Sequence, residues 1–348
     1  MSKKSKHFVN WLIILTLISV SILAACQPAA PAAPTTEAPA AEKKYNIGVS
    51  IQGANNDWAS ASYAHFRYGF EQNKDKIENV YYAECGYDPQ KQLADVEDLL
   101  TKNLDAIIIQ PVSETALVSV FEKAKDMGVK VVMYSGPAAT QAYDTYIDRD
   151  HKITGEKYAQ FVADRIGGKG NVVVIMGYPG SGYSNAVLAG VDSVLAKYPD
   201  IKNLGVEYAE YTPAKSKQII EAYFAKGVEI NGVIVDGGLM GFGVLEAFND
   251  SGRTIPPMTC DDTFLFLKKA VELNFTDYLC ASSGQELSYD AALKVFDVLE
   301  GKPVEKDYVT APQTITGEEV IKTIDPNLPN SYWLFSKTPA ERIAEFFK

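Results

Sequence analysis

Few residues of this 348-residue chain could carry out chemistry, and they are scattered. Its only histidines are His7, His65 and His151, and none stands near a second imidazole or a thiolate that would complete a metal site or a nucleophile and base pair. We interpret His65 and His151 as histidines that lie on the surface or whose ring nitrogens are satisfied by hydrogen bonds. The sequence therefore predicts no metal, no cofactor and no enzymatic activity, and it argues against a hydrolase in particular.

Glycines gather after two of the expected strands. Gly177, Gly180 and Gly182 lie between a strand and a helix, but their spacing fits neither a dinucleotide-binding turn nor a phosphate loop. We interpret them as a tight strand-to-helix turn. A second group, interpreted as positions where helix and sheet approach closely, comprises Gly237, Gly238, Gly241 and Gly243.

Polar and aromatic residues follow the expected strands and form the strongest candidate site. They are Asn55, Asn56, Asp57, Trp58, Tyr134, Ser135, Asn185, Tyr211, Asp236, Asp261 and Gln285. A carboxylate accepts hydrogen bonds from two neighbouring hydroxyls, an amide both donates and accepts, and an aromatic face covers the apolar side of a sugar ring. This set favours a polyhydroxylated ligand. Asn and Asp also cap helices, and we assign Asp57 and Asp262 to capping first.

Short apolar runs alternate with stretches of helical period, which predicts an α/β fold with mostly parallel strands. The expected strands are 46–52, 80–85, 106–110, 129–134, 171–177, 205–211, 232–236, 257–261 and 278–283. Helices are expected behind Asp88-Pro89, Ser113, Thr212-Pro213 and Gln285. Two successive sets of units predict two similar doubly wound lobes, with the break near 147–150 and the ligand site in a cleft at the strand ends.

Composition narrows the class of partner. Hydrophobic residues make up 47% and charged residues 22% of the chain, which is typical of globular proteins, and the length favours two domains. The net charge of -11 opposes binding to nucleic acid.

The first 26 residues are typical of an export signal. Lys3, Lys4 and Lys6 precede a short apolar run, and Leu23-Ala24-Ala25-Cys26 resembles the lipobox of bacterial lipoproteins. We expect residues 1–26 to be a signal peptide cut before a lipidated Cys26, and 27–44 to be an Ala/Pro-rich tether. The protein would then be anchored to membrane lipid and face outside the cytoplasm. An ordinary signal peptide with a chance cysteine is the alternative.

Three cysteines remain after such processing: Cys85, Cys260 and Cys280. An odd number does not indicate a disulfide framework, and we interpret them mainly as small buried apolar residues. A disulfide between Cys260 and Cys280 is an open alternative, because the two residues lie on expected strands that could be neighbours.

From Asn46 to about Thr316 the chain resembles the type I periplasmic sugar-binding proteins, the ribose-binding family of ABC-transporter receptors. Asn55-Asn56-Asp57-Trp58-Ala59 stands in place of the family's first binding loop, which implies hydrogen bonding by Asn56 and stacking by Trp58. Ala209-Glu210-Tyr211 implies a ligand-facing aromatic ring. Met258-Thr259-Cys260-Asp261 implies a binding carboxylate, and Gln285 takes the place of the hinge glutamine.

The chain departs from that family at its basic positions. Ser135-Gly136 replaces an Asp-Arg pair, Asn185 replaces a second arginine, and Gly237-Gly238 replaces an Asn-Asp pair, which leaves Asp236 as the nearest candidate. Without these two arginines, the site lacks two guanidinium groups, which donate several hydrogen bonds in a fixed planar geometry. We therefore expect another sugar, a polyol or a glycoside rather than ribose.

The resemblance also implies three crossings between lobes, near 148–149, 284–285 and 311–313. Lobe one would comprise 45–148 plus 285–312, and lobe two 149–284 plus 313–348 with the C-terminal tail, whose Trp333 we expect to pack on the body.

The implied function is a monomeric receptor that captures a sugar or polyol by hinge closure and delivers it to an ABC transporter permease. Two alternatives remain open: a receptor for signalling or chemotaxis, and a nucleoside- or autoinducer-binding protein of the same fold.

Overall fold

The computed structural model of the chain describes residues 43–53 and 56–346. The predicted signal peptide, Cys26, most of the tether and Asn55 lie outside these residues. In the part that is described, no helix combines the length and the apolar character needed to cross a membrane.

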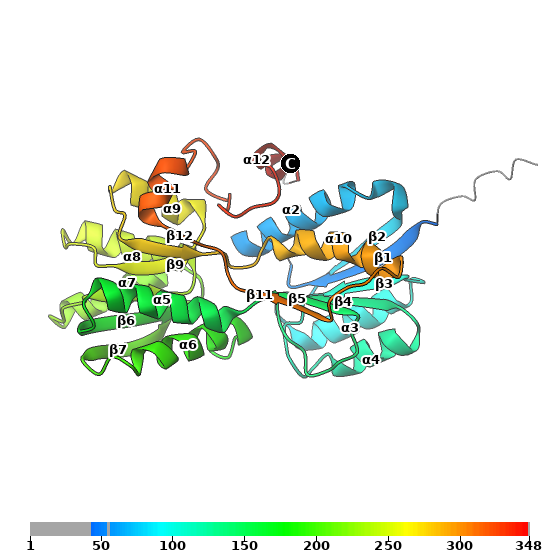
Figure 1. Ribbon diagram of the computed structural model, residues 1–348, viewed down its shortest axis with the longest axis horizontal. Coiled ribbons are helices and arrows are strands. Elements are labelled where there is room, and N and C mark those ends of the chain that lie inside the picture. Colours follow the sequence, from blue (N-terminus) through cyan, green and yellow to red (C-terminus); the bar gives the residue numbers. More distant parts are fainter. Residues whose placement is uncertain (1–42, 54–55, 347–348) are drawn as a thin grey trace, which may run out of the picture. The chain divides into compact units, whose positions relative to one another are not determined.

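The first sheet has six parallel strands in the order β11-β5-β4-β3-β1-β2. Its strands are β1 (Tyr45–Ile51), β2 (Ile77–Glu84), β3 (Ala106–Ile109), β4 (Lys130–Tyr134), β5 (Thr145–Arg149) and β11 (Asp307–Thr310). Its helices are α2 (Asp57–Glu71) and α10 (Leu287–Leu299) on one face and α3 (Pro89–Leu100) and α4 (Val118–Asp126) on the other, with a short 3-10 helix η1 (Lys74–Lys76) (Figure 1).

The second sheet has six strands in the order β12-β10-β9-β8-β6-β7, and only β12 runs antiparallel to its neighbour. Its strands are β6 (Gly170–Met176), β7 (Ile201–Tyr208), β8 (Gly232–Val235), β9 (Met258–Asp261), β10 (Tyr278–Ala281) and β12 (Thr314–Thr316). Its helices are α5 (His151–Arg165) and α6 (Gly182–Leu195) on one face, and α7 (Pro213–Ala225), α8 (Gly238–Asp250) and α9 (Phe264–Glu272) on the other. Helices α11 (Gly317–Thr323) and α12 (Ala340–Phe346) follow.

The central strands are apolar because both of their faces are covered. Along β3, Ile107 packs with α3 and α4 while Ile108 packs with α2 and α10. Along β6, Val173 and Val174 divide in the same way between the two faces of the second sheet. Alternating side chains thus reach opposite layers, and each such burial stabilises the fold by about 1.5–3 kcal/mol.

The predicted α/β fold with two doubly wound sheets is confirmed, and the nine expected strands are all present. Strands β5, β11 and β12 were not expected. The prediction that a helix starts directly after Ser113 was wrong, because α4 begins at Val118. The Ser113 hydroxyl instead accepts a hydrogen bond from the Ala116 amide at 3.3 Å within a turn.

The chain passes between the two sheets after β5, after β10 and after β11, so the three implied crossings are present. Arg149 holds them together. Its guanidinium donates to Glu286 Oε1 at 2.7 Å and to the Thr310 hydroxyl, and these partners lie beside the second and third crossings. All three segments are therefore tied at one side chain.

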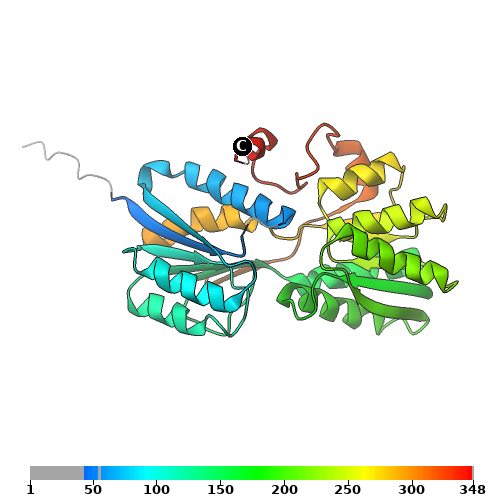
Figure 2. The same ribbon diagram turned by 180° about the vertical axis from the view of Figure 1, so that it is seen from behind.

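The C-terminal tail contacts elements of both sheets. Trp333 is 2% exposed and forms an isolated bridge with Thr263, so its predicted packing on the body is confirmed. Farther on, the Lys337 amide donates to His65 Nε2 of α2 at 3.0 Å, and Arg342 forms an ion pair with Glu71 of the same helix at 2.7 Å. Helix α12 lies beside α2 (Figures 1 and 2). The tail was placed with lobe two alone, yet its last part packs on helices of the first sheet.

Candidate functional site

Asp236 lies directly after β8 and is 1% exposed. Its Oδ2 accepts hydrogen bonds from the Ser184 hydroxyl at 2.8 Å and from the Gly177 amide at 3.2 Å. Its Oδ1 has no hydrogen-bond partner among the described residues. Burial raises the pKa of this carboxyl to about 7, against the opposing effect of the two hydrogen bonds. Asp236 is therefore a buried acceptor with one oxygen left to bind a ligand.

Tyr211 follows β7 in the left-handed backbone region, with φ of 53°. Its hydroxyl lies 3.3 Å from the Ser184 Oγ, so it joins the network around Asp236. The ring packs against Gly177, where an added Cβ would lie 2.0 Å from Tyr211 Cζ, and against Gly237, where it would lie 2.9 Å from Cδ1. Gly177 and Gly237 therefore leave room for the aromatic ring of Tyr211.

Asp261 ends β9 and is 6% exposed. Its Oδ1 accepts hydrogen bonds from the Gly238 amide at 2.6 Å and the Thr263 amide at 3.4 Å. Gly238 must lack a side chain, because a Cβ there would lie 2.2 Å from the same oxygen. Burial raises the pKa of Asp261, and the nearby Asp262 and Asp57 carboxylates raise it further.

Cys260 and Cys280 face each other behind this carboxylate. They are register partners on β9 and β10, and their Sγ atoms lie 3.2 Å apart without a covalent bond. Both are fully buried, as expected for small apolar residues.

The beginning of α2, a helix that packs on the first sheet, also lies in the candidate site. The Asn56 side chain accepts from the Ala59 amide at 2.8 Å, so Asn56 is the helix cap and the assignment of that role to Asp57 was wrong. Asn56 Nδ2 also donates to the Tyr87 hydroxyl at 3.3 Å. Trp58 Nε1 donates to the Ser283 carbonyl at 3.3 Å, which links α2 to the second crossing.

Gln285 lies on that crossing and is fully buried. Its Oε1 accepts from the Ser283 hydroxyl at 3.1 Å, and its Nε2 has no partner among the described residues. A buried amide donor without a partner costs free energy unless a ligand or water satisfies it. Gln285 therefore offers a free donor, as Asp236 offers a free acceptor.

Three predicted site residues make no direct hydrogen bond to Asp236, Asp261 or Gln285 among the described residues. Tyr134 is completely buried in the core of the first sheet, with its hydroxyl 3.3 Å from Ser62 Oγ. Ser135 follows it with φ of 48° and is partly exposed, and Asn185 is exposed on α6. Their ligand roles remain predictions.

Asp262 is not a helix cap, contrary to its assignment. Its Oδ2 accepts from the Phe335 amide at 2.8 Å, so it holds the C-terminal tail. Burial raises its pKa to about 7, and the charge of Glu286 acts in the same direction.

Two tyrosines near the site were missed. Tyr87 follows β2 with φ of 66°, and Tyr178 follows β6; they are 44% and 43% exposed. Their ring centroids lie 6.4 Å apart, and Tyr178 lies 5.7 Å from the Tyr211 ring. Their position at strand ends was the available signal. Ser184 and Ser283 carried no such signal, because only the fold shows which hydroxyls meet a carboxylate or an amide.

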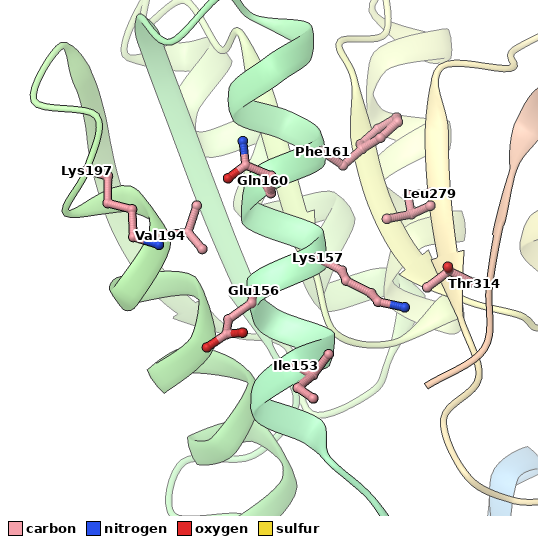
Figure 3. Close-up of a pocket in the computed structure, with 9 residues that line it drawn as sticks. All are labelled: Ile153, Glu156, Lys157, Gln160, Phe161, Val194, Lys197, Leu279 and Thr314. Atoms are coloured by element: carbon pink, nitrogen blue, oxygen red, sulfur yellow. The ribbon is translucent and has the colours of Figure 1, made fainter. Parts of the chain in front are cut away.

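A surface hollow of about 520 Å³ lies elsewhere, over α5 (Figure 3). Its lining residues are Ile153, Glu156, Lys157, Gln160, Phe161, Val194, Lys197, Leu279 and Thr314, and none of them is a predicted site residue. Within the described ranges no group of three His, Cys, Asp or Glu side chains is placed to hold a metal ion.

The two sheets, their crossings and the polar strand ends define a class of binding protein. Residues 47–303 match the family model described as a periplasmic binding protein domain, and the chain belongs to this family. The resemblance to type I sugar receptors is thereby confirmed, and the chain is a binding protein rather than an enzyme.

Known binding proteins and a solved structure are similar to this chain. A xylitol-binding protein of Mycolicibacterium smegmatis is 32% identical over 68% of either chain. The ribose import binding protein of Bacillus subtilis is 27% identical over 86% of this chain and 96% of its own. The periplasmic binding component of the arabinose ABC transporter from Shewanella sp. ANA-3 has the same fold, with a TM-score of 0.73, 22% identity, and coverage of 80% of this chain and 93% of that one.

Proposed function

We propose that this chain is the extracytoplasmic substrate-binding component of an ABC transporter and that it captures a sugar or polyol. The ligand would bind between the strand ends of the two sheets, in contact with Asn56, Trp58, Tyr211, Asp236, Asp261 and Gln285. The xylitol- and ribose-binding relatives support this ligand class. The chain would work as a monomer that hands its liganded form to a permease.

The observation that carries the proposal is the set of free polar atoms at these strand ends. Asp236 Oδ1 and Gln285 Nε2 are buried without partners among the described residues. The Asp236 carboxylate oxygen accepts hydrogen bonds and the Gln285 amide nitrogen donates them. This pair suits ligand hydroxyls, because a hydroxyl both donates and accepts. A ligand that satisfies atoms on the second sheet and on the crossing would favour closure, because only the closed arrangement provides both sets of contacts.

We also propose that lipid on Cys26 keeps the receptor at the membrane, and that residues 27–44 hold it away from the headgroups. The lipobox-like residues before Cys26 support this, and two acyl chains suffice for stable anchoring. Metabolic labelling with a palmitate analogue should label the wild-type chain but not Cys26→Ser.

A thermal-shift panel of pentoses, hexoses and polyols, followed by calorimetry, tests the ligand class. Ligand at about 100 times its Kd stabilises the folded state by roughly 2.7 kcal/mol, so a true ligand should raise Tm clearly. Asp261→Asn should weaken the best ligand by about 1.5–3 kcal/mol, the loss of one charged hydrogen bond. Asp192→Asn, on the exposed face of α6, is the matched control and should not change affinity. No stabilisation by any sugar or polyol would contradict the proposal.

A further inference from the structure

Three carboxyl groups at the proposed site have no basic partner among the described residues. Asp57 begins α2, Asp236 follows β8 and Asp261 ends β9. Asp57 and Asp261 are close enough for their charges to repel, which raises the pKa of Asp261. No Lys, Arg or His of residues 43–53 and 56–346 forms an ion pair with any of the three. The site therefore holds carboxyl groups that have acceptor capacity but no basic partner.

The two basic side chains of the first crossing are already engaged. Arg149 forms its ion pair with Glu286 at 2.7 Å. His151 Nε2 lies 3.1 Å from Asp148 Oδ1, and its ring lies 4.7 Å from the Tyr183 ring. Neither one neutralises the carboxylates at the strand ends.

Two tyrosines lie close to Asp236. Tyr183 donates its hydroxyl to the Asp236 carbonyl at 3.0 Å, and Tyr211 lies on the other side. Burial raises the pKa of both phenols, and the nearby aspartates raise it further. On the side of Asp261, Asp262 adds another negative charge, and Thr263 adds a buried hydroxyl without a partner among the described residues.

We propose that the ligand is a polyhydroxylated molecule that carries a protonated amine, that is, an amino sugar or an amino polyol. This rests on the proposed function, since it names the ligand class of the same site. The ammonium would lie between Asp236 and Asp261 and donate to Asp236 Oδ1, while the ligand hydroxyls would meet Gln285 and Asn56. These carboxyls are already almost fully buried, so their ionised form is disfavoured. An ammonium would favour that ionised form through charge-assisted hydrogen bonds, which a neutral ligand does not offer.

The proposal predicts the direction of proton exchange. Burial raises the pKa of Asp236 to about 7, so near pH 6.5 this carboxyl is partly protonated in the free protein. A bound ammonium lowers that pKa, and the displaced proton goes to the buffer. A neutral polyol offers no positive charge, so it lowers this pKa less and should release fewer protons.

Calorimetry with matched pairs tests this: glucosamine against glucose, glucamine against sorbitol, and an inosamine against inositol, with N-acetylglucosamine as the uncharged amide control. For at least one pair the amine should bind 10-fold or more tightly than its neutral partner. Runs at pH 6.5 in two buffers of different ionisation enthalpy should show proton release with the amine.

Two variants localise the effect. Asp236→Asn, which keeps the acceptor for Ser184 and Gly177, and Asp57→Asn should each reduce the preference for the amine, whereas Asp192→Asn should leave it unchanged. Equal or tighter binding of the neutral partners, or proton uptake with the amine, would overturn the inference while leaving the proposed function intact. Binding of neither member of any pair would overturn both.

Discussion

Replacing Gly177 by alanine should displace Tyr211 from the site. The new Cβ would lie 2.0 Å from Tyr211 Cζ and 2.3 Å from Cε2, whereas carbon atoms in contact lie about 3.5–4.0 Å apart. The ring must therefore move by roughly 1.5 Å or more, given that contact distance. Such a shift breaks its contact with the Ser184 hydroxyl. The expected cost is that of overpacking, about 1–3 kcal/mol in the free energy of unfolding.

A double-mutant cycle with Tyr211→Ala isolates this clash. Without the ring, Gly177→Ala meets little resistance, and the smaller entropy of the unfolded alanine chain favours folding by about 0.4–1 kcal/mol. Urea denaturation of the four proteins should therefore give a coupling free energy of about 1.4–4 kcal/mol, the difference between these two effects. Gly182→Ala is the control, since the nearest atom to the new Cβ would be Glu114 Oε1 at 3.8 Å. Equal costs of Gly177→Ala in both backgrounds would refute the reasoning.

Two further predictions concern the C-terminal tail. Burial lowers the pKa of His65 from 6.5 to about 4, so the folded protein binds fewer protons than the unfolded chain between these values, and His65 stabilises less as pH falls through that window. The stability deficit of His65→Asn, measured by urea denaturation, should then shrink by roughly 3 kcal/mol between pH 7 and pH 4, and a constant deficit would contradict it. Trp333→Ala should cost about 3–5 kcal/mol, because the ring is 2% exposed, and a loss below 1 kcal/mol in the same assay would show that the tail is not docked.

Much of the fold could be predicted because its central strands are buried on both faces. Runs such as Ala106–Ile109 are apolar without interruption, which is typical of parallel strands under two helical layers. The unexpected strands lack this pattern: β5 is mixed in character, β11 is largely exposed, and β12 has three residues. They exist through pairing with distant strands, which local periodicity does not reveal.

The geometry of the candidate site could be predicted in part, while its ligand contacts stay predictions. Polar residues at strand ends pointed to Asp236 and Asp261 because parallel strands place their carboxyl ends at one edge. The role of Asp262 could not be found, since its partner Phe335 lies 73 residues away along the chain. Likewise, capping by Asn56 rather than Asp57 depends on a shift of one residue at the start of α2, and helix ends are poorly determined by sequence patterns.

A crystal structure of the chain with the ligand selected by the binding panel tests the central claim most directly. We predict a sugar or polyol framework within hydrogen-bonding distance of Asp236 and Asp261, with Trp58 or Tyr211 against its apolar face. Electron density for the ligand in the hollow over α5, or at any site without these two carboxylates, would contradict the account.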